Sequence, residues 1–440
     1  MYRNRELIYL VAPTGLPNFG DEFIAAAWLR TLARRRPSAR VILDCRTPGS
    51  VAVLHAGLHP NLTVTDTLFR LCDEARREAD PQSAHFDEVV RIAEEGMRNP
   101  EAVPHLESGL RLAQAADVVH VLGGGWFNDM WPEHAGVVAA ASVAGESEAL
   151  RVMTGIGLLP GAETAKRLRE VWPRFDRIDL RDEGSTELVK QYVGESLAER
   201  CAVTCTGDDA WTVLGGADLE DNGLGFGTEA ARERNVVVCL QSDLLKESAA
   251  EAESDPVTDL ALATIRILQS WGVRGSDIAV VEAIPEVDSL VWTRVAELAR
   301  EHAPELVDDV LMVRFFELWN HGLPVRAGQK WLSTRFHPHL IAAARGAHGV
   351  ALDAHVENYY TVKHGLVTAA GSQWTVADPY AEAETNIMPG QGMSAEAVER
   401  ARELKLATID AVYPMSRVQE KTLNTAVRAR RLARRALTRR

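Results

Sequence analysis

Cysteine is scarce in this chain of 440 residues. Five are present, at the scattered positions Cys45, Cys72, Cys201, Cys205 and Cys239. Cys201 and Cys205 stand four apart, but no second pair lies nearby with the spacing of a zinc site. The pattern argues against a disulfide framework and against a cysteine-rich metal centre. It favours free thiols in a reducing compartment.

Long apolar runs are also missing. No stretch approaches the ~20 apolar residues that a helix needs to cross a bilayer. The N-terminus leads into ELIYLVAP (6–13), which is too short for a secretion signal and is soon followed by a glycine-bearing turn. We therefore expect a cytoplasmic protein.

Basic charge is in deficit, with 48 Lys and Arg against 62 Asp and Glu and a net charge of −14. This balance disfavours general nucleic-acid binding, which depends on the neutralisation of many phosphates. The last twenty residues (421–440) differ, because they hold eight basic residues and no acidic one. This tail could contact anionic lipid at the inner membrane face or an acidic face of the protein itself, or it could form a solvated final helix.

The rest of the composition is that of a globular protein, with 46% hydrophobic and 25% charged residues. A chain of this length exceeds what one core usually serves, so two domains are expected. Short apolar runs alternate with helical patterns, as in a parallel sheet covered on both faces. The predicted strands are 7–12, 40–45, 117–122, 151–157, 177–180, 235–240, 277–283 and 349–353.

We predict an α/β fold of two Rossmann-like domains facing a cleft, followed by a C-terminal helical tail. The expected ranges are 1–170, 171–390 and 391–440, with the tail carrying the basic residues. The charged segment 73–100 reads as an exposed helical insertion. A binding site is expected where the carboxyl ends of the strands face the cleft.

The first candidate site motif is NFGD (18–21), between a strand and a helix start. Gly20 permits a tight turn there, and the first helical N–H groups could receive an anion or a sugar oxygen. Asp21 could instead simply cap its own helix. Both interpretations stay open from the residues alone.

The second motif is GGGWFND (123–129), which follows another predicted strand. Three consecutive glycines are entropically costly, so they suit a place where the backbone must approach a ligand or another segment. A sharp turn is the alternative. Asn128 and Asp129 would then be polar groups at the edge of the cleft. The glycines are Gly123, Gly124 and Gly125.

Three further motifs place cations just beyond predicted strands. RDEGS (181–185) offers Arg181, STRFHPH (333–339) offers Arg335 and His337, and ENYYTVKHG (357–365) offers Lys363. Surface ion pairs or solvation are the simple alternatives for each alone. Two histidines at i, i+2 could share a metal, but no third ligand is evident and we expect none. Together the set could bind phosphate and move a proton near neutral pH.

These motifs, in this order, resemble the polysaccharide pyruvyl transferase family. The resemblance rests on N-F-G-D-E at 18–22, G-G-G at 123–125, R-D-x-x-S at 181–185, a D-P-A-like triplet at 208–210, R-x-H at 335–337 and Y-x-x-K at 360–363. Phe336 replaces the usual Leu, Pro338 stands where Gly is common, and Asp209 replaces Pro. These departures spare the charged positions.

The resemblance implies a GT-B-like fold and transfer of the pyruvyl group of phosphoenolpyruvate to a saccharide as a ketal, in cell-surface polysaccharide or glycan biosynthesis. Phosphoenolpyruvate would be a co-substrate, with no cofactor, and the acceptor could be lipid- or nucleotide-linked. We assign His337 to proton transfer, Arg181 to electrostatic catalysis, and Arg335 and Lys363 to the donor's anionic groups. The acceptor would lie on the first domain, against Asn18, Gly20, Asp21, Gly123, Gly124, Gly125, Asn128 and Asp129.

Two alternatives remain from the sequence. One is a GT-B glycosyltransferase that uses a nucleotide sugar, in which Glu282 or Glu357 would hold the donor ribose. The other is a catalytically silent, sugar-binding member of the same fold, although such a protein would not need all four cationic positions. Because these readings share one fold, the fold cannot separate them.

Overall fold

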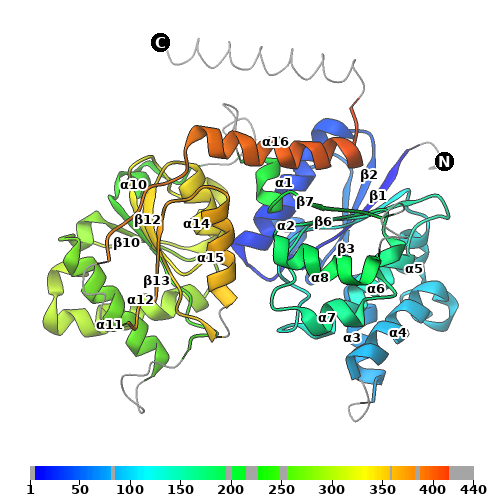
Figure 1. The fold of residues 1–440 in the computed structure, drawn as a ribbon, viewed down its shortest axis with the longest axis horizontal. Coiled ribbons are helices and arrows are strands. Elements are labelled where there is room, and N and C mark those ends of the chain that lie inside the picture. Colours follow the sequence, from blue (N-terminus) through cyan, green and yellow to red (C-terminus); the bar gives the residue numbers. More distant parts are fainter. Residues whose placement is uncertain are drawn as a thin grey trace.

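The structure, a computed structural model, describes residues 5–80, 85–194, 201–214, 226–246, 255–356, 359–381 and 387–415. Two parallel β-sheets form two lobes that lie side by side (Figure 1). Each sheet carries one buried hydrophobic cluster on either face. The predicted fold class, with two Rossmann-like domains facing a cleft, is confirmed.

The first sheet has seven strands in the order β3-β2-β1-β4-β5-β6-β7. Chain order reverses between β1 and β4, which places a topological switch point, the usual ligand position of such sheets, at that boundary. The strands are β1 (Leu7–Val11), β2 (Arg40–Asp44), β3 (Leu62–Thr65), β4 (Val118–Val121), β5 (Leu150–Ile156), β6 (Arg177–Leu180) and β7 (Ala202–Cys205).

The second sheet has six strands in the order β10-β9-β8-β11-β12-β13, and its switch point lies between β8 and β11. Its strands are short, and all but the edge strands β10 and β13 are largely buried, as expected for strands with helices on both faces. They are β8 (Val236–Cys239), β9 (Ile278–Val281), β10 (Leu311–Val313), β11 (Lys330–Ser333), β12 (His348–Leu352) and β13 (Thr375–Ala377).

Helices connect these strands and cover the sheets. Around the first sheet lie α1 (Phe19–Arg35), α2 (Pro48–Leu54), α3 (Thr67–Glu78), α4 (His85–Arg98), α5 (Glu107–Gln114), α6 (Ala135–Val143), α7 (Ala162–Arg167) and α8 (Glu183–Val193). From there on the chain has α10 (Glu229–Glu233), α11 (Pro256–Ser270), α12 (Val287–His302), α13 (Phe315–His321), α14 (Phe336–Ala344), α15 (Tyr359–Ala369) and α16 (Ala395–Val412).

The expected end of the first domain at residue 170 needs correction. Strand β6 pairs with β5, and β7 pairs with β6, so the first sheet continues to Cys205. The sequence suggested an early boundary because β7 is short and only partly buried. Arg181, which follows β6, therefore belongs to the first lobe, not to the second.

The described residues of the segment 73–100 include the end of α3 and the whole of α4, so helix is present as predicted, but the segment is not an exposed insertion. Helix α4 is amphipathic and buries Val89, Ala93 and Met97 in the first lobe's core, against α3 and α6. Its charged residues face outwards and gave the segment its solvated appearance.

Helix α16 begins beside the second lobe and ends on the first (Figure 1). Gly371 lies against Ala397 near its start, whereas Tyr413, just past its end, accepts a hydrogen bond from Arg35 of α1. The helix thus ties the two lobes together. The basic tail predicted at 421–440 lies outside the described residues.

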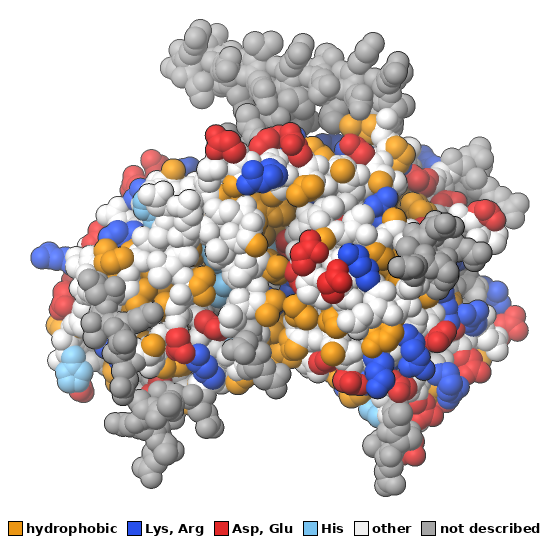
Figure 2. All heavy atoms as spheres, in the orientation of Figure 1, with side chains coloured by type: hydrophobic (Ala, Val, Ile, Leu, Met, Phe, Trp, Pro, Cys, Tyr) orange, Lys and Arg blue, Asp and Glu red, His pale blue; other side chains and the backbone are white. Residues whose placement is uncertain are grey.

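The surface is mixed in charge. On the face drawn in Figure 2, acidic and basic side chains are interspersed and form no broad basic patch. Among the described residues, no helix combines the length and the apolar character that a membrane crossing requires. All five cysteines are free thiols, four of them buried.

Candidate active site

A cavity of about 610 Å³ lies between the two lobes. Its first-lobe wall comes from the β1–α1 turn, the glycine segment after β4, and the end of β6. Its second-lobe wall comes from the β9–α12 loop and the first turns of α14 and α15. Of the predicted site residues, the cavity is lined by Asn18, Gly20, Asp21, Gly125, Arg181, Arg335, His337 and Lys363.

The turn before α1 is held by Asn18, which is the N-cap of that helix. The Gly20 N–H donates to Asn18 Oδ1 (3.1 Å), and Asn18 Nδ2 donates to Asp21 Oδ2 (2.8 Å). The proposal that Asp21 caps its own helix is therefore wrong, because Asn18 performs that task. The Asp21 side chain is left facing the cavity.

Gly20 is where the two lobes meet. A Cβ on Gly20 would lie 2.1 Å from Nδ1 of His337 on α14. No side chain fits at this position unless the imidazole moves. Glycine is required here for the approach of the second lobe, so its role goes beyond a tight turn.

The glycine segment after β4, Gly123 to Gly125, packs closely against several neighbouring residues. Gly123 donates its N–H to Asp209 Oδ2 (3.1 Å), and Gly124 has a positive φ of 128° beside the Trp126 ring. A Cβ on Gly125 would lie 2.9 Å from Nη2 of Arg181. Gly125 lines the cavity, whereas Gly123 and Gly124 support the turn from behind.

Arg181 is 7% exposed and lies under this glycine segment. A Cβ on Gly157, which follows β5, would lie 2.0 Å from its Nε, and that nitrogen is buried without a hydrogen-bond partner among the described residues. Its guanidinium lies over the Phe336 ring at 5.0 Å and 3.8 Å from Asp208 Oδ2. Arg181 thus offers the cavity an incompletely used donor set.

Asp208 connects Arg181 to His337. Nε2 of His337 lies 3.4 Å from Asp208 Oδ1. Burial alone would raise the pKa of Asp208, but His337 and Arg181 stabilise the carboxylate and lower its pKa to about 2. An ionised Asp208 can hold Nε2–H of the imidazole, which leaves Nδ1 as the nitrogen on the cavity side, towards Gly20.

Arg335 reaches the cavity as half of a buried ion pair. Its Nε lies 3.0 Å from Asp288 Oδ1, and its Nη2 contacts the same oxygen. Burial opposes the charge on the guanidinium, but Asp288 more than compensates and raises its pKa. The pair orients Arg335 and also neutralises much of its charge.

Lys363, 9% exposed, has a different environment. Its Nζ lies 3.6 Å from the centroid of the Tyr359 ring, and within the described ranges no carboxylate lies within 4.0 Å of it. Burial and the neighbouring cations Arg181 and Arg335 lower its pKa well below the ordinary value. An anion entering the cavity would supply the missing counter-charge.

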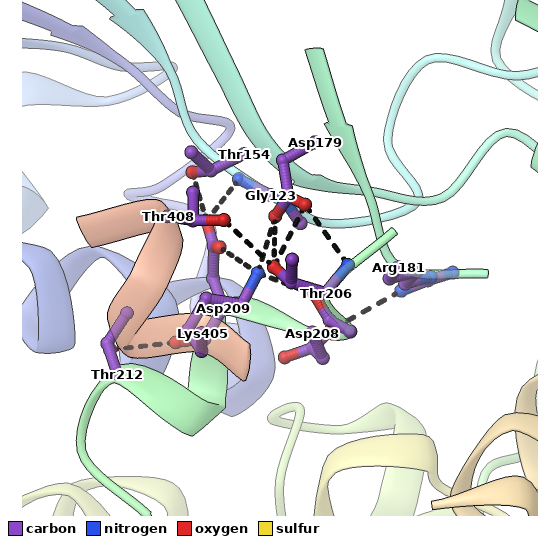
Figure 3. Close-up of polar contacts among 12 residues, drawn as sticks. Gly123, Thr154, Asp179, Arg181, Thr206, Asp208, Asp209, Thr212, Lys405 and Thr408 are labelled. Atoms are coloured by element: carbon purple, nitrogen blue, oxygen red, sulfur yellow. Dashed lines mark hydrogen bonds and ion pairs between the residues drawn. The ribbon is translucent and has the colours of Figure 1, made fainter. Parts of the chain in front are cut away.

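Behind the cavity lies a fully buried ion cluster, drawn in Figure 3. Lys405 of α16 lies 2.8 Å from Asp179 Oδ2 and 3.1 Å from Asp209 Oδ1. Asp209 also accepts hydrogen bonds from Trp28, Thr154 and Gly123. This cluster fixes the glycine segment and the residue next to Asp208.

Three predicted positions lie away from the cavity. Asn128, fully buried, accepts from the N–H of Met130, and Asp129 accepts from the N–H groups of Glu163 and Thr164 at the start of α7. Both shape the loop instead of facing the cleft. His339 is buried against His364 and Trp374, so it does not share a ligand with His337.

The sequence did not single out Asp288, Lys405 or the role of Asp208. Asp208 follows β7, which was not predicted, so its strand-end position was hidden. Asp288 could have been found as an acidic residue in the first turn of a predicted helix. Lys405 carries no local signal, because its partners are about 200 positions away.

Within the described ranges, no group of three or more His, Cys, Asp or Glu side chains is placed to hold a metal ion. The cavity is lined by two imidazoles, four carboxyl groups and four cations, among them His337, Asp21, Arg181, Arg335 and Lys363. That set suits a small polyanion and proton transfer.

Comparison with solved structures finds distant similarity. The UDP-N-acetylglucosamine 2-epimerase of Neisseria meningitidis is 12% identical, with a TM-score of 0.47 over 96% of this chain and 100% of that one. The trehalose 6-phosphate synthase of Burkholderia multivorans is 11% identical, with a TM-score of 0.46 over 98% and 99%. No curated protein matches the chain.

The family comparison is more informative. The model of the polysaccharide pyruvyl transferase family matches residues 18–258, more than half of the chain. The match begins at Asn18 and includes the glycine segment, Arg181 and Asp208, which the structure brings to one cavity or directly behind it. The chain therefore belongs to the polysaccharide pyruvyl transferase family and is a transferase.

Proposed function

We propose that this protein transfers the pyruvyl group of phosphoenolpyruvate to two hydroxyls of a saccharide, forming a ketal and releasing phosphate. The observation that carries the proposal is the state of two buried cations. Lys363 has no carboxylate within ion-pair distance in the described part of the chain, and Arg181 keeps a buried Nε without a partner. A compact anion with several acceptor oxygens would satisfy both.

Phosphoenolpyruvate fits this need through its two anionic groups, a phosphate and a carboxylate. Arg335 and Lys363 hold these groups from the second lobe. Arg181 approaches from the first lobe and stabilises negative charge as the phosphate departs. Arginine is too basic to donate a proton itself, so its role is electrostatic.

His337 delivers the proton that starts the reaction. Protonation of the methylene carbon C3 makes C2 electron-deficient, and a sugar hydroxyl attacks C2. The C2–O bond to phosphate then breaks, and a second hydroxyl closes the ketal. Asp208 stabilises the imidazolium and fixes its orientation through Nε2.

The acceptor would lie on the first-lobe side, beside Asn18, Asp21, Trp126 and Trp131. Aromatic rings next to polar oxygens suit a sugar, which presents C–H groups on its faces and hydroxyls at its edges. The acceptor's hydroxyls would thus face the donor across the contact of Gly20 with His337.

The test is to incubate the full chain with phosphoenolpyruvate and a panel of methyl hexosides and UDP-N-acetylglucosamine. We expect inorganic phosphate together with a new ketal methyl signal in the NMR spectrum of the sugar. Release of UDP without ketal would indicate glycosyl transfer instead. Saccharide binding that phosphoenolpyruvate leaves unchanged would indicate a silent sugar-binding protein.

The glycosyltransferase alternative has little structural support. Glu282 accepts hydrogen bonds from Arg314 and from the N–H of Phe315, and it does not line the cavity. Its carboxylate is therefore used within the second lobe. Glu357 lies outside the described residues.

A further inference from the structure

In the proposed ketal formation, two hydroxyl groups each lose a proton. So far only one proton-transfer group, the His337 imidazole, has been assigned. The reaction needs a second group that accepts a proton from the attacking hydroxyl and later gives one to the departing phosphate. This group must face the acceptor, so it should lie on the first lobe near His337. The inference made here rests on the proposed function.

Four carboxyl groups line the cavity: Asp21, Glu133, Asp243 and Glu286. Asp243 and Glu286 are exposed and belong to the second lobe. Glu133 is on the first lobe, next to His134, whose Nδ1 lies 2.5 Å from the backbone oxygen of Trp126. Asp21 alone among these four stands at the contact between the lobes, directly after Gly20, whose α-carbon faces Nδ1 of His337.

The geometry of Asp21 leaves one oxygen for a substrate. Asn18 Nδ2 donates to Oδ2 at 2.8 Å and fixes the carboxyl group. Oδ1 lies on the side of the glycine segment, 3.5 Å from where a Cβ on Gly124 would be. Because Asn18 caps α1, Asp21 is not needed to satisfy the helix N-terminus.

We propose that Asp21 is the second proton-transfer group of the reaction, acting first as base and then as acid. In the first step C3 takes the proton of the His337 imidazolium while Asp21 takes the proton of the attacking hydroxyl. The product is a tetrahedral adduct with phosphate still on C2. His337 is now neutral and Asp21 is protonated.

The second step reverses both protonation states. The C2–O bond to phosphate breaks, and Asp21 returns its proton to the departing phosphate oxygen. The second hydroxyl bonds to C2 and gives its proton to neutral His337. The proton of the first hydroxyl thus leaves on phosphate. The proton of the second hydroxyl replaces the one that His337 gave to C3. Asp21 and His337 therefore both return to their starting protonation states.

The electrostatics around Asp21 suit both roles. Burial raises its pKa, and Glu22 on the same helix raises it further, whereas His337, Lys363 and Arg181 lower it; the balance is about 6. A group with this pKa can accept a proton near neutral pH and also give it up. The three groups that lower the pKa come from three different elements: His337 from α14, Lys363 from α15 and Arg181 from the end of β6.

The experiment compares D21N with the wild type and with E163Q, an exposed carboxylate in the first turn of α7. Binding of phosphoenolpyruvate is measured by calorimetry, and kcat for the best acceptor of the panel is measured from pH 5 to 8. Melting temperatures check that each variant is folded. We expect D21N to bind phosphoenolpyruvate, to lose kcat by about 100-fold or more, and to lose the fall in kcat below pH 6. E163Q should match the wild type.

The outcomes are separable. A D21N kcat within tenfold of the wild-type value, or an acidic limb that persists in D21N, overturns the role of Asp21. A wild-type protein that forms no ketal with any acceptor and releases no phosphate overturns the proposed function instead, before any variant is compared.

Discussion

Two buried lysines in this molecule have opposite surroundings. Lys405, fully buried in α16, lies between the carboxylates of Asp179 and Asp209, and these raise its pKa against the effect of burial. Lys363, nearly as buried, stands over the Tyr359 ring with its pKa lowered well below the ordinary value. A buried charge without a counter-ion is costly in free energy, so such a charge is kept where a ligand supplies the partner.

The same contrast separates two neighbouring residues. Asp209 points into the Lys405 cluster (Figure 3) and accepts hydrogen bonds from three other residues. Asp208 contacts His337 and Arg181 instead, and its Oδ2 has no hydrogen-bond partner in the described ranges. The Asp209 carboxylate holds α16 on the first lobe through Lys405. The Asp208 carboxylate contacts two residues that line the cavity.

The largest effect should come from His337. H337A should lower kcat for ketal formation by about 10²–10⁴-fold, because the other imidazole that lines the cavity, His134, is engaged by the backbone oxygen of Trp126 on the first lobe. The melting temperature should hardly change. H339A is the informative counterpart: that ring is fully buried behind the cavity, so its loss should lower stability. Near-normal ketal formation by H337A would remove His337 from the mechanism.

Exchanging each lysine for methionine tests the comparison directly. K405M leaves Asp179 and Asp209 buried together, which should lower the free energy of unfolding by about 3–5 kcal/mol. K363M removes a buried amine that has no counter-ion, so stability should be kept or increased, while phosphoenolpyruvate binding is weakened. Denaturant unfolding and calorimetry measure the two effects. Equal destabilisation by both variants would contradict the distinction between them.

The order of the predicted strands and the motifs at their ends gave the architecture and most of the cavity's cationic residues. What the sequence could not give depended on long-range partners. Arg181 was assigned to the wrong lobe because the short strand β7 was not predicted. The prediction that 73–100 is an exposed insertion was wrong because the charged face of α4 dominates its sequence, while its other face is buried. The need for glycine at position 20 could not be predicted, because it depends on the His337 imidazole, 317 positions later in the chain.

Gly20 itself should have an intermediate effect. In G20A the new methyl group would overlap the His337 ring, so the lobes cannot approach fully, and kcat/KM should fall by about 100-fold. G365A is a matched control, since that helical glycine in α15 has no neighbour within 4 Å of the added Cβ. Its stability should rise by about 0.5–1 kcal/mol with activity kept. A G20A enzyme as active as G365A would show that the contact between the lobes is dispensable.

The smallest effect is a proton taken up on binding. Lys363 in the free protein has a lowered pKa, and a bound phosphoenolpyruvate anion would raise it, so binding should be coupled to proton uptake and should weaken as pH rises. Calorimetry in two buffers with different ionisation enthalpies measures the uptake, and K363M should reduce it. Lys405 is already saturated by its two carboxylates, so it adds nothing to the coupling. Uptake that is unchanged in K363M would mean that the proton goes to another group, and the contrast between the two lysines would then lose its functional meaning.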